Sequence, residues 1–112
     1  MNTTVEFDPS RIYLATVEAG EDWVDKNAAA KLLEESKKSV LAEIMNSKAE
    51  HASMAAKEAA ALADPAYKLH LSQMVAARKA ANVARVRYDA VKVMGENRRS
   101  QESTRRAEMA LK

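Results

Sequence analysis

The chain has 112 residues, which is enough for one domain with a modest hydrophobic core. Two glycines and two prolines supply too few turns for an all-β fold, and the absence of cysteine excludes disulfides and thiolate metal sites. The formal net charge of +2 conceals an asymmetry, because residues 1–65 carry 7 Lys and Arg against 12 Asp and Glu, whereas residues 66–112 carry 11 against 4. The abundance of Ala, Glu, Lys, Leu and Arg predicts an all-α protein.

The first residues, MNTTVEFDPSRIY, contain neither the basic segment nor the apolar segment of a signal peptide. No run of 18 apolar residues long enough to cross a membrane occurs in the sequence. We therefore expect a cytoplasmic protein that makes no use of a membrane.

The first predicted helix begins at an Asp-Pro pair, with Asp8 as N-cap and Pro9 in the first helical position. It carries Ile12, Tyr13, Thr16 and Val17. Gly20 is expected to end it, since glycine is the usual residue after a helix C-terminus. The predicted helix covers residues 9–19.

A second, amphipathic helix is predicted over residues 22–46. Its apolar face is expected to consist of Val24, Ala28 or Ala29, Leu33, Val40 and Ile44, at spacings of three, four and seven residues. The opposite face is polar and contains Lys31, Glu34, Glu35 and Lys38.

Residues 46–53 are the expected break before a third helix over about 52–63, capped by Ser47 or Ser53. A continuous helix through this region is the alternative, because Ala, Glu and Lys are good helix formers. Asp64-Pro65 then repeats the first helix start. From there a helix is predicted to about residue 108, a rod on the order of 60 Å long.

Together these helices predict a single domain over residues 1–112, folded as an elongated antiparallel helical hairpin or small bundle. Residues 96–112 are expected to be either a projecting basic extension or a frayed tail. The long helix carries an a/d seam of mostly small residues, which permits close approach of another helix: Met74, Ala77, Ala81, Ala84, Tyr88, Val91 and Gly95. Beyond Gly95 the seam turns polar, so apolar pairing should end there.

A second apolar row lies on the other side of this helix and consists of Val83, Val86, Ala90 and Val93. Two apolar faces favour a helix packed between neighbours, one of them from another subunit. A homo-oligomer follows, with a dimer as the default. The alternative is that an alanine-rich helix looks apolar all round without being buried all round.

Basic residues recur every seven positions along the long helix, at Arg78, Arg85, Lys92, Arg99 and Arg106. They can pair with an acidic helix containing Glu34, Glu35 and Glu43, contact nucleic-acid phosphates, or face an acidic partner protein. The segment RRSQESTRR contains two arginine pairs. The predicted binding residues for DNA or an acidic protein surface are Lys92, Arg98, Arg99, Arg105 and Arg106. Tyr88 is the only aromatic residue placed to stack on a base, which weakens the nucleic-acid interpretation.

Nothing in the sequence indicates catalysis. His51 and His70 lie nineteen residues apart with no cluster of metal ligands around either. There is no glycine-rich phosphate loop, nucleophile elbow or zinc-binding His-Glu-x-x-His motif. We expect no catalytic residue, metal, cofactor or small-molecule substrate, and hence no enzyme.

Residues 62–109, around the segments ADPAY, ANVARVRYDA and TRRAEM, resemble small helical proteins of tailed-phage early gene cassettes. Those proteins are encoded beside recombination and single-strand-binding genes. The resemblance implies a phage accessory protein of the host cytoplasm that acts on DNA recombination or a DNA-processing complex. The alternative is a protein-protein module without direct DNA contact, such as an assembly factor or an inhibitor of a host nuclease or defence complex.

Overall fold

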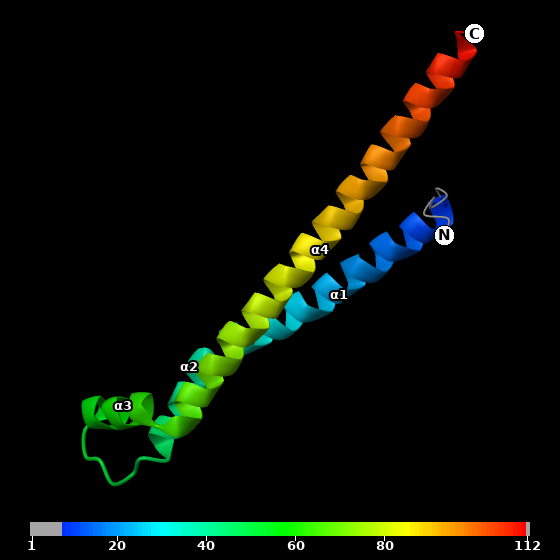
Figure 1. Ribbon diagram of the computed structural model, residues 1–112. Coiled ribbons are helices and arrows are strands. Elements are labelled where there is room, and N and C mark those ends of the chain that lie inside the picture. The colour runs from blue at the N-terminus through cyan, green and yellow to red at the C-terminus, as the bar shows by residue number, and fades with distance from the viewer. Residues whose placement is uncertain (1–7, 112) are drawn as a thin grey trace, which may run out of the picture. The chain divides into compact units, whose positions relative to one another are not determined.

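The computed structural model describes residues 8–111, which contain four helices and no strand (Figure 1). They are α1 (Pro9–Glu35), α2 (Lys37–Asn46), α3 (Met54–Ala63) and α4 (Pro65–Ala110). The prediction of an all-α protein with a long C-terminal helix is confirmed. Helix α4 ends at Ala110, two residues later than expected. The predicted extension is therefore helical from residue 96 to residue 110.

Side-chain caps begin three of the four helices. The Asp8 carboxylate accepts a hydrogen bond from the Ser10 amide at 2.9 Å, and Asp64 does the same for Ala66 at 2.8 Å. In both cases a free amide of the first turn is satisfied, as the Asp-Pro pairs predict. Ser53, one of the two expected caps for α3, accepts from the Ala56 amide at 3.1 Å.

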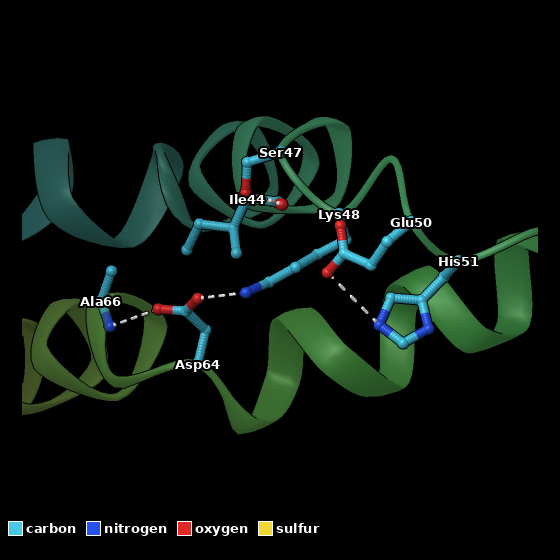
Figure 2. A network of polar contacts seen from close by, with 7 residues as sticks. All are labelled: Ile44, Ser47, Lys48, Glu50, His51, Asp64 and Ala66. Carbon is cyan, nitrogen blue, oxygen red and sulfur yellow. Dashed lines mark hydrogen bonds and ion pairs between the residues drawn. The ribbon is translucent and has the colours of Figure 1, made fainter.

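Asp64 also connects the start of α4 to the segment that follows α2. Figure 2 shows the Lys48 ammonium beside one Asp64 carboxylate oxygen, while the other oxygen accepts from the Ala66 amide and caps α4. The Lys48 nitrogen lies 2.7 Å from the Asp64 oxygen. The hydrogen bond from Lys48, and then that from the Ala66 amide, hold the pKa of Asp64 below its usual value. The same contact raises the pKa of Lys48. One carboxylate therefore serves both as a helix cap and as an ion-pair partner.

Gly20 does not end a helix, contrary to the prediction, because α1 runs through it to Glu35. No glycine among the described residues has the positive φ of a left-handed helix cap. Gly20 instead lies against Tyr88, whose Cε1 would be 3.3 Å from a Cβ at this position. The glycine serves close packing of α1 on α4, and a second helix beginning at residue 22 does not exist.

The break that the sequence did not predict lies at Ser36, between α1 and α2. The Ser36 hydroxyl donates to the Leu32 carbonyl at 2.6 Å, and the His70 Nε2 lies 2.9 Å from the Leu33 carbonyl oxygen. Serine bonding back to the preceding turn bends helices. The backbone at Ser36 has ψ −1°, far from the helical value.

The described residues form two compact units, and α1 and α4 each contribute to both. In the unit of residues 24–82, α1 and α4 run antiparallel, because Asn27 contacts Arg78 while Leu33 contacts His70. Helices α2 and α3 pack on each other in the same unit. Its buried residues are mostly small, and they are Ala30, Ala61, Tyr67, His70 and Ala81.

In the other unit, residues 8–23 of α1 pair with residues 83–111 of α4. A Cβ at Gly95 would lie 3.0 Å from Ile12 Cγ2, and Gly20 faces Tyr88, so this pair is also antiparallel. Ala84 and Gly95 are buried between the helices. The expectation of one domain over residues 1–112 stays a prediction.

The apolar face predicted for the region after residue 22 is wrong in its first half. Val24 is 58% exposed and Ala28 and Ala29 are also exposed, whereas Ala30 is fully buried. The packed side of α1 contains polar residues such as Asn27 and Glu34, which bind Arg78. Because this contact between α1 and α4 is polar, the apolar residues of the sequence do not mark the packed side of α1 in this region. Leu33, Val40 and Ile44 are half-buried.

Candidate binding surface

The predicted a/d seam of α4 consists of residues that the structure places at least half out of solvent. Ala81, Ala84 and Gly95 are buried, and Met74, Ala77, Tyr88 and Val91 are half-buried. After Gly95 every described residue except Glu102 is exposed, which confirms that apolar pairing ends there. The second row lies in solvent in the single chain, with Val83 44%, Val86 68% and Val93 52% exposed.

The first basic residue of the seven-residue repeat, Arg78, is fully engaged by α1 within residues 24–82. Its Nε and Nη2 donate to the two Glu34 carboxylate oxygens at 2.9 and 2.6 Å, and its Nη1 donates to Asn27 at 2.9 Å. This two-point pairing lowers the pKa of Glu34 and raises that of Arg78. At this position the basic residue pairs with the acidic helix, which is one of the three interpretations of the stripe.

The next two basic residues, Arg85 and Lys92, lie over aromatic rings in the unit of residues 8–23 and 83–111. The Arg85 guanidinium is 5.9 Å from the Trp23 ring centre, and the Lys92 ammonium is 4.4 Å from that of Tyr88. The two rings stack at 6.0 Å with an interplanar angle of 25°. Lys92 also pairs with Asp89 at 3.4 Å. Both cations thus contribute to packing by cation–π attraction.

The last arginines of α4 differ from these. Arg98, Arg99, Arg105 and Arg106 are all exposed, and none makes an ion pair or hydrogen bond with any residue from 8 to 111. At 100° per residue, Arg98 and Arg105 lie nearly in line at d positions of the continued seam. Arg99 and Arg106 lie nearly in line beside it. The four arginines among the five predicted binding residues therefore form two separate pairs.

A groove of about 620 Å³ lies where the first turns of α1 face α4 beyond Gly95. Pro9, Ile12, Tyr13 and Thr16 line it from α1, and Gly95, Arg99, Glu102, Ser103 and Arg106 line it from α4. Of the two arginine pairs, only Arg99 and Arg106 reach it. We call this surface the α1/α4 groove.

The floor and the rim of the α1/α4 groove differ in chemistry. Ile12 and Pro9 are apolar, and Tyr13, which is 68% exposed, adds an aromatic ring. Glu102 is half-buried between the two arginines, at three residues from Arg99 and four from Arg106. The groove therefore presents positive, negative and positive charge in succession beside an apolar surface.

Charge in this unit as a whole is balanced. Its described residues, 8–23 and 83–111, contain eight Lys and Arg and eight Asp and Glu. The positive charge is concentrated in residues 97–111, where four arginines face two glutamates. The surface thus attracts anions locally and lacks the broad positive field of a typical nucleic-acid-binding domain.

The α1 side of the groove does not follow from the sequence pattern. That pattern predicts a short separate helix for Ile12 and Tyr13 and indicates only a polar segment around Glu102 and Ser103. An antiparallel alignment that fixes Ile12 opposite Gly95 would have brought these residues together. That alignment depends on the close contact at a helical glycine, which the pattern of apolar residues does not reveal.

A shallower depression of about 470 Å³ lies on α4 itself, and Arg98 is part of it together with Val93, Met94 and Asn97. Within residues 8–111 no group of three or more His, Asp or Glu side chains is placed to hold a metal ion. In the same part of the chain, no helix is long and apolar enough to cross a membrane.

No protein-family model, no curated protein and no solved structure matches this chain. The site is therefore interpreted from its own geometry.

Proposed function

We propose that this protein is a non-enzymatic interaction module that binds an acidic surface of a partner protein through the C-terminal part of α4. The observation that supports it is the changing environment of the basic stripe. Arg78 is paired, Arg85 and Lys92 lie on aromatic rings, and the arginines from residue 98 onward have no partner among residues 8–111. Cations held by neither packing nor pairing are available to a partner.

Three features favour a protein over a nucleic acid. The unit that carries the arginines has no net charge in its described residues. Glu102 lies between Arg99 and Arg106, where it would repel a phosphate backbone. The groove is lined partly by Ile12 and Tyr13, and apolar side chains beside unpaired arginines are typical of the centre of a protein interface.

DNA binding is the second candidate function, and the exposure of all four arginines favours it. Arg98 and Arg105 do not line the groove, so they can reach phosphates without the groove being filled. Binding of this kind is sequence-independent and weakens steeply with salt.

We further propose that the partner belongs to a DNA-processing or host-defence complex. The resemblance of residues 62–109 to helical proteins of tailed-phage early gene cassettes supports this assignment. The protein would then act in the host cytoplasm as an accessory factor or an inhibitor, without chemistry of its own.

The proposal is tested by affinity capture with the purified protein and with a variant in which Arg98, Arg99, Arg105 and Arg106 are changed to Glu. Cell extract is treated with nuclease so that nucleic acid cannot bridge. We expect a protein that is retained by the wild type and lost with the variant, and that binds directly once purified.

Circular dichroism of both chains checks that the variant is still folded. A mobility-shift assay with single- and double-stranded DNA at low salt tests the second candidate in parallel. If DNA shifts and no direct protein partner survives nuclease treatment, the protein-binding proposal is wrong and DNA binding replaces it.

A further inference from the structure

We infer that the α1/α4 groove receives an amphipathic helix of the partner, with two carboxylates seven residues apart and a cationic residue between them. This inference rests on the proposed function and specifies the shape and charge pattern of what is bound. It concerns Arg99, Glu102 and Arg106 as one recognition element and excludes Arg98 and Arg105 from it.

The length of the groove suits about three turns of a helix. It extends along α4 from Gly95 to Arg106, which is roughly 16 Å at 1.5 Å per residue. It is lined by residues of two helices. Amphipathic helices bind in grooves of this kind by placing their apolar side on an apolar floor. Ile12 and Tyr13 provide that floor, and Tyr13 is largely unburied without an occupant.

The charges of the groove then determine the pattern of the occupant. Arg99 and Arg106 are two helical turns apart, at about 10.5 Å. A helix lying alongside α4 presents residues seven apart at the same spacing, so two carboxylates at that separation meet both guanidiniums. A third side chain between them faces Glu102, and a Lys or Arg there turns a repulsion into an attraction.

This alternation disfavours the other anionic occupants. A nucleic-acid strand carries negative charge at every phosphate and would meet Glu102 whichever way it lay. A uniformly acidic peptide meets the same repulsion. A helix with alternating charge pairs with all three residues of the groove.

The test uses synthetic helical peptides of roughly 20 residues, long enough to hold a helix in water when rich in alanine. Each carries Glu at two positions seven apart and Leu on the adjoining face. The central residue lies three or four positions after the first Glu, so that both directions of the bound helix are covered. It is Lys in one set of peptides and Glu in the other. Binding to the full-length protein is measured by fluorescence anisotropy at physiological salt.

We expect the Lys-centred peptide to bind about two- to fivefold more tightly than the Glu-centred one, as one exposed ion pair allows. The variant Glu102→Lys should reverse this order. That reversal is specific to a direct charge contact, because a merely structural role of Glu102 would alter both peptides alike.

Matched variants separate the groove from general attraction. One double variant changes Arg99 and Arg106 to Glu, and its control changes Arg98 and Arg105 to Glu, the same change of charge on the same helix. We expect the first to weaken binding of the Lys-centred peptide at least about fivefold more than the control. Ser103→Trp, inside the groove, should also weaken binding, whereas Ser100→Trp, exposed on α4 outside it, should not.

Equal losses for the two arginine pairs, or no binding of either peptide set, overturn the inference. In both cases the proposed function still holds if the captured partner binds the wild type and not the fourfold arginine variant. If no such partner is captured either, the proposed function is wrong as well. If the protein forms a dimer that Arg99→Glu with Arg106→Glu dissociates, the occupant is a second copy of this chain. The inference of a partner helix is then wrong.

Discussion

The basic stripe of α4 shows how far the neighbours of a residue decide its role. Arg78 faces Glu34 and Asn27 and forms a three-point contact. One heptad later Arg85 faces Trp23, and three heptads later Arg99 faces an open groove. The repeat in sequence is regular, but the side chains around each basic residue differ from step to step. The repeat alone therefore predicts where the cations lie and not what they bind.

Replacement of Arg78 by Ala should raise the pKa of Glu34 towards its ordinary value of 4.5, because the hydrogen bond from Arg78 is the main cause of the depression. The shift is measured by NMR titration of the Glu34 side-chain carbonyl. Arg87→Ala is the matched control, since Arg87 is exposed on the same helix. An unchanged Glu34 pKa in Arg78→Ala would show that the ion pair does not persist in solution.

At the scale of elements, the pairing of α1 with α4 depends on small residues. Ala30 and Ala81 are fully buried, and at Gly20 and Gly95 a Cβ would come within 3.3 and 3.0 Å of side chains on the opposite helix. Close approach of this kind leaves no room for larger side chains. The helix pair is thus sensitive to enlargement of its seam residues.

Ala81→Leu should destabilise the protein by about 2 kcal/mol, the usual effect of overpacking a filled interface. Ala80→Leu makes the same change at an exposed position of α4 and should alter the free energy of unfolding by at most about 0.5 kcal/mol. Urea unfolding followed by circular dichroism measures both. Equal effects of the two substitutions would contradict the tight seam.

The elements also show what the sequence could predict. The helix starts at Asp8, Asp64 and Ser53 follow from local capping chemistry, and the α4 seam follows from its heptad spacing. The break at Ser36 could not be predicted, because it involves a contact between the Leu33 carbonyl and His70, 37 residues apart in the chain. Gly20 was misassigned since the same residue type serves helix ends and close helix contacts. The arginine side of the groove was predictable, and the Tyr13 side required the antiparallel register.

For the whole molecule, two carboxylates make stability depend on pH. The pKa values of Glu34 and Asp64 are lowered in the folded chain, so the unfolded chain binds protons more readily at these groups. Their contribution is fully present above their ordinary values of 4.5 and 3.8, and it is lost as the pH falls through the lower folded values.

We therefore expect the melting temperature to fall as the pH is lowered from about 6 to about 3. A variant with Glu34→Gln and Asp64→Asn should show a weaker dependence on pH over that range. The Asn retains a helix cap, so the comparison isolates the charges. Differential scanning calorimetry provides the measurement, and identical slopes for the two proteins would refute this account.

Self-association is a further property of the whole molecule that stays a prediction. The exposed row of Val83, Val86 and Val93 lies on one side of α4 at heptad spacing and favours a homo-oligomer. Sedimentation equilibrium should show a dimer for the wild type and a monomer for Val86→Lys. A wild-type monomer at all concentrations would rule out this use of the row.

The alanine-lined seam also affects how the protein responds to heat. No large side chain among residues 8–111 is fully buried, so unfolding exposes less apolar surface per residue than it does in a protein with a large core. The heat-capacity change of unfolding should then fall below the usual value of roughly 12–15 cal/mol/K per residue. The denaturant m-value should likewise be small for the chain length. A small heat-capacity change flattens the curve of stability against temperature. The protein should therefore gain or lose little stability between cold and warm surroundings.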